Sequence, residues 1–237
     1  MKYCLFALTL IVATSIAAST AFAGSISAPS GLNPGDQFRI VFVTDGTIRG
    51  NNEVSSTYDS LVQSEAAGTT YNGNSVTWLA IISSSNFANP VSAISHIGEN
   101  TTSSIPVYLV DGTKVASSDN SNGLWSGALQ HSINEDIGGQ TNLAFSVWTG
   151  TSSSGTIATP TNSHFGIRPT YGSTVSSDAN WINAGTSSNT TSYHVYGISE
   201  VLTVPQATAA VPEPSTAMLA GLGGLVALAY SLKRKRN

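Results

Sequence analysis

An uncharged apolar run near the C-terminus limits what this chain can fold into more than any other feature. Residues 216–232 carry no charge, and four consecutive basic residues follow them, namely Lys233, Arg234, Lys235 and Arg236. These 17 apolar or small residues reach the lower end of the roughly 17 to 25 that cross a bilayer as a helix. Because Lys and Arg at the end of a span favour the cytoplasmic side, we expect residues 24–204 to lie outside the cytoplasm.

A proline-rich strip, Val211, Pro212, Glu213 and Pro214, comes directly before this span. Proline lacks a backbone N–H and pushes the preceding residue towards extended geometry, so the strip is predicted to be stiff and unfolded. The strip, the span and the basic cluster together resemble the PEP-CTERM sorting signal of Gram-negative, biofilm-forming bacteria. The resemblance implies recognition by an exosortase, a membrane cysteine protease or transpeptidase that would cut near the motif. An ordinary single-pass tail anchor is the alternative, and both interpretations include a stage in the inner membrane.

The N-terminus has the pattern of a secretory signal peptide. Lys2 precedes an apolar stretch at residues 5–18, and Ala21-Phe22-Ala23 is a small-residue cleavage site. We expect cleavage after Ala23, and a retained N-terminal anchor is the alternative. The only cysteine, Cys4, lies within residues 1–23, so the mature chain would carry no disulfide or thiolate site.

Residues 24–204 have the length of one domain, and residues 205–210 are predicted to link it to the sorting signal at residues 211–237. Four basic and twelve acidic residues give the domain a formal net charge of −8. This balance argues against a nucleic-acid partner. Serine, threonine, asparagine and glycine fill the intervals between charges, as in many extracellular proteins with polar but uncharged surfaces.

Apolar patterning predicts an α+β domain with more strand than helix. Residues 38–43 are expected to form a central buried strand, because apolar residues fall on both of its faces and turn signals flank the run. A helix is predicted over residues 58–65, where apolar residues recur at helical spacing, with Ser55 or Ser56 as its cap and Gly68 after its end. The other strand candidates are residues 76–82, a hairpin at residues 107–115, residues 144–148 and residues 194–204.

Short tryptophan- and tyrosine-containing segments follow the predicted helix in a characteristic order. They are residues 78–80, 106–108, 124–127, 147–150, 180–182 and 196–200. Their arrangement is similar to the C-type lectin-like and endostatin-like layout, which implies that the first and last strands pair and that the loops form a binding face. The cystines and the calcium signature of true C-type lectins are absent from the sequence. A β-sandwich would show many of the same short strands and is the alternative fold.

Motifs for metal-dependent or nucleophilic catalysis are missing from the sequence. The histidines His96, His131, His164 and His194 lie far apart, and no cysteine completes a zinc set. The serine-rich run at residues 150–155 is not a G-x-S-x-G motif and is typical of a surface loop. We therefore predict no metal site, no cofactor and no enzymatic activity.

Two acidic features leave alternatives open. Glu135 with Asp136, and Glu99 with Asp111, are candidate carboxylate pairs for glycoside hydrolysis, but spacing does not select among such pairs. Residues 119–123 place oxygen donors at alternate positions, as in part of a calcium loop, but lack the EF-hand spacing and its closing glutamate. An Asx-rich turn is the simpler interpretation, because Asp and Asn hydrogen-bond their own backbone.

Trp125 and Trp181 are the candidate ligand-binding residues, because Asn, Ser and Gly surround them and an indole face can stack on a sugar ring. Anchoring in the core is the commoner role of tryptophan and is the alternative. The sequence predicts an exported, non-catalytic surface or biofilm-matrix protein with an exosortase as processing partner and exopolysaccharide as candidate ligand. The alternative function is an exported polysaccharide-active hydrolase.

Overall fold

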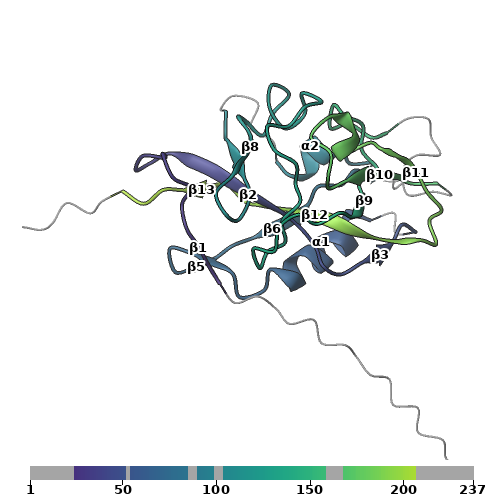
Figure 1. Ribbon diagram of the computed structural model, residues 1–237. Helices are drawn as coiled ribbons and strands as arrows, with labels where there is room; N and C mark the ends of the chain where they lie inside the picture. The colour runs from purple at the N-terminus through teal and green to yellow at the C-terminus, as the bar shows by residue number, and fades with distance from the viewer. Residues whose placement is uncertain (1–23, 52–53, 85–89, 99–103, 159–167, 207–237) are drawn as a thin grey trace, which may run out of the picture. The chain divides into compact units, whose positions relative to one another are not determined.

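The computed structural model describes residues 24–51, 54–84, 90–98, 104–158 and 168–206 (Figure 1). The predicted signal peptide at residues 1–23 and the sorting signal at residues 211–237 lie outside these residues. The chain divides into two units, Met1–Val204 and Pro205–Asn237, and the fold described below is that of the first. Within the described ranges, no helix combines the length and apolar character that crossing a bilayer requires.

The described domain is rich in short strands and contains one helix, α1, longer than four residues. In chain order the elements are β1 (Ser25–Ile26), β2 (Gln37–Val43), β3 (Ile48–Arg49), α1 (Ser55–Glu65), β4 (Thr70–Tyr71), β5 (Asn74–Ser75), β6 (Trp78–Ala80), α2 (Ala93–His96), β7 (Val107–Tyr108), β8 (Lys114–Ala116), β9 (Ser146–Trp148), β10 (Thr170–Ser173), the 3₁₀ helix η1 (Ala179–Trp181), β11 (Gly185–Thr186), β12 (Ser192–Ser199) and β13 (Leu202–Thr203).

Strand β12 is the central element of the main sheet. It pairs antiparallel with β2, β3 and β6 and parallel with β9. The ladders with β2 and β6 share Gly197 and Ile198, so these two strands lie on opposite edges of β12. Beyond β2 the sheet continues through parallel β7 to β8, and beyond β9 through β10 to β11. A second sheet of three strands has the order β1-β4-β5.

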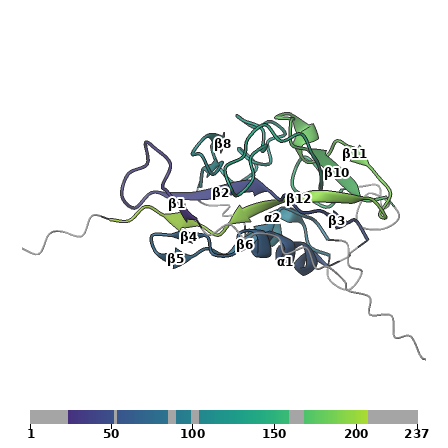
Figure 2. The same cartoon turned by 60° about the horizontal axis from the view of Figure 1, so that its bottom comes forward.

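The two faces of the main sheet bury two separate apolar clusters. Because successive side chains of a strand point to opposite faces, Phe38, Ile40 and Phe42 enter the cluster that contains α1, while Val41 and Val43 enter the other. In Figure 2, α1 and β4–β5 lie below β2 and β12, and the segments around β8 and β10 lie above them. Burial on both faces explains why β2 has a nearly continuous apolar run instead of an alternating one.

Helix α1 packs directly on β12 because Gly197 has no side chain. A Cβ atom at Gly197 would lie 2.7 Å from Val62 Cγ1 of the helix. Val62 and Tyr58 are fully buried, as the helical spacing predicted. The predicted serine cap is wrong, because Val54 occupies the N-cap position and makes no side-chain cap hydrogen bond.

The structure confirms the longer predicted elements and shortens or adds several small ones. Strand β2, helix α1 and the hairpin of β7 and β8 lie where the sequence placed them. Only Trp78–Ala80 of the strand predicted at residues 76–82 is a strand. Strands β4, β5 and β10 were not predicted, because two to four residues carry too little periodicity to be recognised.

Candidate functional site

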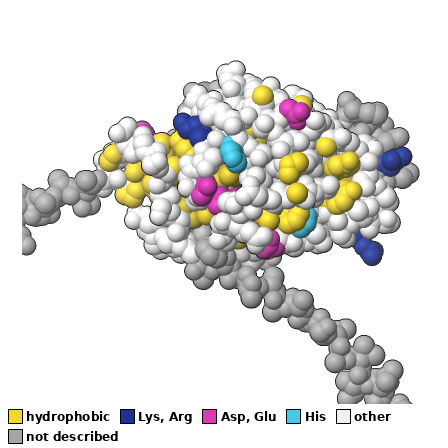
Figure 3. Space-filling model, in the orientation of Figure 1, with side chains coloured by type: hydrophobic (Ala, Val, Ile, Leu, Met, Phe, Trp, Pro, Cys, Tyr) yellow, Lys and Arg dark blue, Asp and Glu magenta, His cyan; other side chains and the backbone are white. Residues whose placement is uncertain are grey.

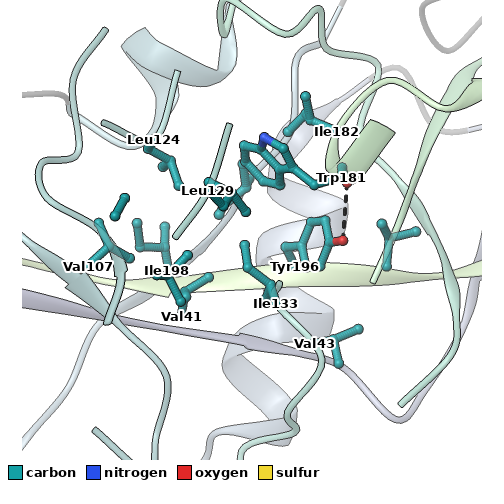
Figure 4. Close-up of a cluster of buried hydrophobic side chains, with 14 of the residues drawn as sticks. Val41, Val43, Val107, Leu124, Leu129, Ile133, Trp181, Ile182, Tyr196 and Ile198 are labelled. Atoms are coloured by element: carbon teal, nitrogen blue, oxygen red, sulfur yellow. Dashed lines mark hydrogen bonds between the residues drawn. The ribbon is translucent and has the colours of Figure 1, made fainter. Parts of the chain in front are cut away.

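Trp125 and Trp181 both belong to the core on the loop-covered face of the sheet. Their side chains are 3 % and 0 % exposed, and their ring centroids lie 5.8 Å apart. Trp181 also packs against Tyr196, whose hydroxyl donates a hydrogen bond of 3.1 Å to the Trp181 carbonyl (Figure 4). Both rings are buried, which is the core-anchoring arrangement that the sequence left open as the alternative to sugar stacking. The loops that carry them fold over β12, because β12 would otherwise expose Tyr196 and Ile198.

The side chain of Arg39 in β2 is buried on this same face. Its Nη1 donates to the carbonyls of Ile97 at 2.9 Å and Ser199 at 3.3 Å, and its Nη2 donates to the carbonyl of Gly98 at 3.1 Å. Its Nε lies 3.1 Å from Asp119 Oδ2 in an ion pair whose two side chains are 3 % and 0 % exposed. Burial lowers the pKa of Arg39, and the charge of Asp119 opposes this effect.

Residues 119–123 form a turn around this ion pair. Asn120 Oδ1 accepts hydrogen bonds from Ser118 Oγ at 2.7 Å and from the Asn122 N–H at 2.9 Å, which is an Asx turn. The Asn120 carbonyl accepts from the Gly123 N–H at 3.0 Å. The turn interpretation is therefore confirmed, and Asp119 serves as the counterion of Arg39.

The acidic residues Glu65, Glu135 and Asp136 are buried near the end of β2. Glu65 accepts hydrogen bonds from the backbone N–H groups of Asp45, at 2.8 Å, and Gly46, at 2.6 Å, so it holds the turn after β2. Glu135 accepts from the Asp111 N–H at 3.2 Å, and Asp136 accepts from the Gln140 N–H at 2.8 Å. Each of these carboxylates orders a turn of the backbone.

Desolvation raises the pKa of Glu65 and of Asp45, and the charge of Asp136 raises both further. His194 lies beside this group, where its Nδ1 is 2.7 Å from the Thr44 carbonyl and its ring stacks on Phe145 at 3.8 Å. Burial lowers the pKa of His194, against the opposing effects of the Thr44 carbonyl and Asp45.

In the described part of the chain, no group of three His, Cys, Asp or Glu side chains is arranged to hold a metal ion. Glu99 and His164 lie outside that part.

A surface groove of about 560 Å³ follows the outer side of α1, which is within the range of roughly 300–1,000 Å³ for small-ligand sites. Its lining combines one face of the helix with a tryptophan of β6, namely Ser56, Asp59, Ser60, Gln63, Ser64 and Trp78. Trp78 is 1 % exposed and forms the floor, while Ser60, Gln63 and Ser64 are exposed. We call this surface the α1 groove.

Two side chains of α1 complete the outer edge of β6. Asp59 Oδ1 accepts from the Ala80 N–H at 2.8 Å, and Gln63 Oε1 accepts from the Trp78 N–H at 2.9 Å. Four residues along a helix rise about 6 Å, and two residues along a strand span about 6.8 Å, so the two pairs are nearly in register. Asp59 Oδ1 also lies 2.8 Å from His96 Nε2 of α2. The base of the α1 groove is therefore fixed by backbone hydrogen bonds.

Sequence reasoning missed Asp59, Gln63 and His96. The available signal was the polar stripe of the predicted helix, where Ser56, Ser60 and Ser64 recur every four residues. Helical spacing places such residues on one face. Which strand that face would meet depends on the tertiary fold.

Two other surface grooves also contain one acidic residue each. One lies between β5 and β13 and includes Glu200, and the other lies beside the start of β2 and includes Asp36. Figure 3 shows few Lys and Arg side chains on the visible face, which consists mainly of uncharged polar side chains and backbone. The described grooves therefore present single carboxylates on a weakly charged surface.

Comparison with known families identifies the C-terminal sorting signal, which lies outside the described residues. Residues 210–235 match the family model for the PEP-CTERM protein-sorting motif. This motif defines a class of exported proteins that are sorted and processed by an exosortase, a membrane enzyme. The chain therefore carries a PEP-CTERM sorting signal near its C-terminus. A search of curated proteins found no match to the chain.

Replacing Arg39 with Met is expected to lower the free energy of unfolding by about 3–5 kcal/mol, because Asp119 would keep a buried charge without its counterion. Combining Arg39→Met with Asp119→Asn should cost less than the sum of the two single changes, since the two groups interact directly. Urea unfolding followed by tryptophan fluorescence measures both quantities. Arg168→Met at an exposed position is the control and should change stability by no more than about 0.5 kcal/mol. Additive losses at Arg39 and Asp119 would contradict the coupling.

Glu65 is expected to make stability depend on pH. Burial raises the pKa of the Glu65 carboxyl above the ordinary 4.5, so the folded state binds the carboxyl proton more tightly than the unfolded state does. The protonated carboxyl therefore stabilises the fold at low pH, and this stabilisation is lost as pH rises through the folded pKa. Glu65→Gln should therefore gain stability relative to the wild type between about pH 4 and about pH 7.

The lowered pKa of His194 acts with the opposite sign. The neutral imidazole stabilises the folded state above the unfolded pKa, and this stabilisation is lost as pH falls through the folded pKa. His194→Gln should therefore lose stability relative to the wild type as pH rises. Urea unfolding of the three proteins across this range measures both trends. A pH-independent offset for Glu65→Gln would contradict the first.

Proposed function

We propose that this protein is a cell-surface or biofilm-matrix protein whose domain at residues 24–204 is a non-catalytic module that contacts exopolysaccharide. The match of residues 210–235 to the sorting motif carries the proposal, because it indicates export and processing by an exosortase. The weakly charged, hydroxyl-rich surface suits an extracellular module of this kind.

The proposed route uses both ends of the chain. A signal peptide at residues 1–23 directs export, and residues 216–232 hold the chain in the inner membrane of a Gram-negative bacterium, with Lys233 to Arg236 on the cytoplasmic side. The exosortase then acts near Pro212 to Pro214. The mature protein reaches the cell surface or the extracellular matrix.

We further propose that the domain has a C-type lectin-like arrangement. Three observations support it: β2 pairs antiparallel with the last long strand and with β13, α1 covers one face, and long loops cover the other. A β-sandwich packs two antiparallel sheets on each other. The parallel pairs β2–β7 and β9–β12, and the helix against the sheet, favour the lectin-like layout over that alternative.

The non-catalytic role is supported by how the carboxylates are used. Retaining and inverting glycosidases place two carboxyl groups roughly 5–9.5 Å apart across a substrate site. Glu135 and Asp136 are buried and accept backbone hydrogen bonds, and each described groove includes a single acidic residue. A polysaccharide-active hydrolase is the less favoured alternative.

Replacing Pro212, Glu213 and Pro214 together with alanine is expected to block processing, because the exosortase would lose its recognition strip. Mass spectrometry of both chain ends in the native host should then find an uncleaved C-terminus ending at Asn237, where the wild type ends near residues 212–214. Alanine or serine replacements at residues 206–208 in the linker are the control and should leave processing unchanged. Normal processing of the triple variant would remove the motif from the mechanism.

The full chain, purified from its host, is expected to bind the host's exopolysaccharide without shortening it. Affinity electrophoresis measures binding, and a reducing-end assay on the same mixture measures turnover. Retarded migration with a constant number of reducing ends agrees with the proposed function. A steady, protein-dependent increase in reducing ends would establish the hydrolase alternative.

A further inference from the structure

The α1 groove provides a mixed row of hydrogen-bonding groups with little charge. The Ser60 and Ser64 hydroxyls donate to helix carbonyls at 2.8 Å, of Ser56 and Leu61 respectively, so their oxygen lone pairs can accept further bonds. Gln63 uses Oε1 for the Trp78 N–H, which leaves its Nε2 as a donor. The groove therefore combines donors and acceptors along one helix face.

The deeper part of the groove keeps one further acceptor for a ligand. Asp59 binds Ala80 and His96 through Oδ1, and no hydrogen bond to Oδ2 occurs within the described residues. Because Oδ1 and the Gln63 carbonyl are held by β6, the remaining atoms are presented in a fixed geometry.

The lining also selects against other classes of ligand. The described part of the lining contains no Lys or Arg, which phosphate backbones and acidic polymers need. It offers no exposed Trp, Tyr or Arg of the kind that anchors a protein partner. The formal charge of −8 over residues 24–204 adds a general repulsion of anions. A neutral ligand rich in hydroxyl groups fits this combination, because each hydroxyl both donates and accepts.

The geometry points to the α1 groove as a binding site for a neutral polysaccharide. This inference rests on the proposed function and adds to it the position of the site and the charge of the polymer. The serine hydroxyls, Gln63 Nε2 and Asp59 Oδ2 bind the sugar hydroxyls along the helix. The site lies on α1, away from Trp125 and Trp181 and from the loops above the opposite face of the sheet.

Two matched substitutions on α1 test the site. Ser60→Glu puts a larger, charged side chain into the groove, whereas Thr57→Glu adds the same side chain at an exposed position of the same helix outside its lining. Isothermal titration calorimetry of the full-length wild type and both variants uses dextran and mannan as neutral probes and alginate as the acidic probe. Circular dichroism melting of each protein verifies that it is folded.

We expect the wild type to bind a neutral probe and not alginate, Ser60→Glu to weaken binding by about tenfold or more, and Thr57→Glu to change it less than about twofold. Gln63→Ala is the second variant and should also weaken binding, through the loss of its amide donor.

Equal affinity of Ser60→Glu and the wild type would overturn the α1 site and leave the proposed function intact. Preference for alginate would overturn the inferred polymer class, and the absence of binding to all polysaccharides, including the host's own, would overturn the proposed function itself.

Discussion

The buried guanidinium of Arg39 is the interaction on which the loop-covered half of this domain depends. A charge without water must be surrounded by charged or dipolar partners, because desolvation costs several kcal/mol per ion. Here Asp119 supplies the countercharge, and the carbonyls of Ile97, Gly98 and Ser199 supply the dipoles. These partners come from three separate segments: the end of α2, the end of β12 and the turn at residues 119–123. One side chain of β2 thus holds together parts of the chain up to 160 positions away from it.

The opposite face of the sheet is organised by close packing and by edge capping. Gly197 lets α1 approach β12, and at that distance Asp59 and Gln63 reach the outward N–H groups of β6. An uncapped strand edge invites pairing with another chain, so these two contacts protect the sheet. They also orient the polar groups of the α1 groove. The same side chains therefore stabilise the fold and line the α1 groove.

Particular residues show which parts of the structure the local sequence pattern could predict. Phe38 to Val43 and the helix through Tyr58 and Val62 were predictable, because long apolar runs and helical spacing are local signals. The Asx turn after Asp119 followed from side-chain chemistry alone. Trp125 and Trp181 show the limit: their polar neighbours in sequence suggested exposure, but the chain folds back over them and both lie in the core. Nothing in the sequence distinguishes Asp59 from other surface acids. Its place in the α1 groove depends on the packing of α1 against β6.

The sequence by itself identified the sorting signal of this protein, since the motif at residues 210–235 is defined by the order of its residues along the chain. It also determined the acidic, weakly charged composition, which argues against a nucleic-acid partner. Only the tertiary structure decided which polar residues share a surface. Asp59, Gln63 and Trp78 converge because β12 carries β6 on one edge and packs against α1, and contacts between segments distant in sequence leave no mark in local periodicity.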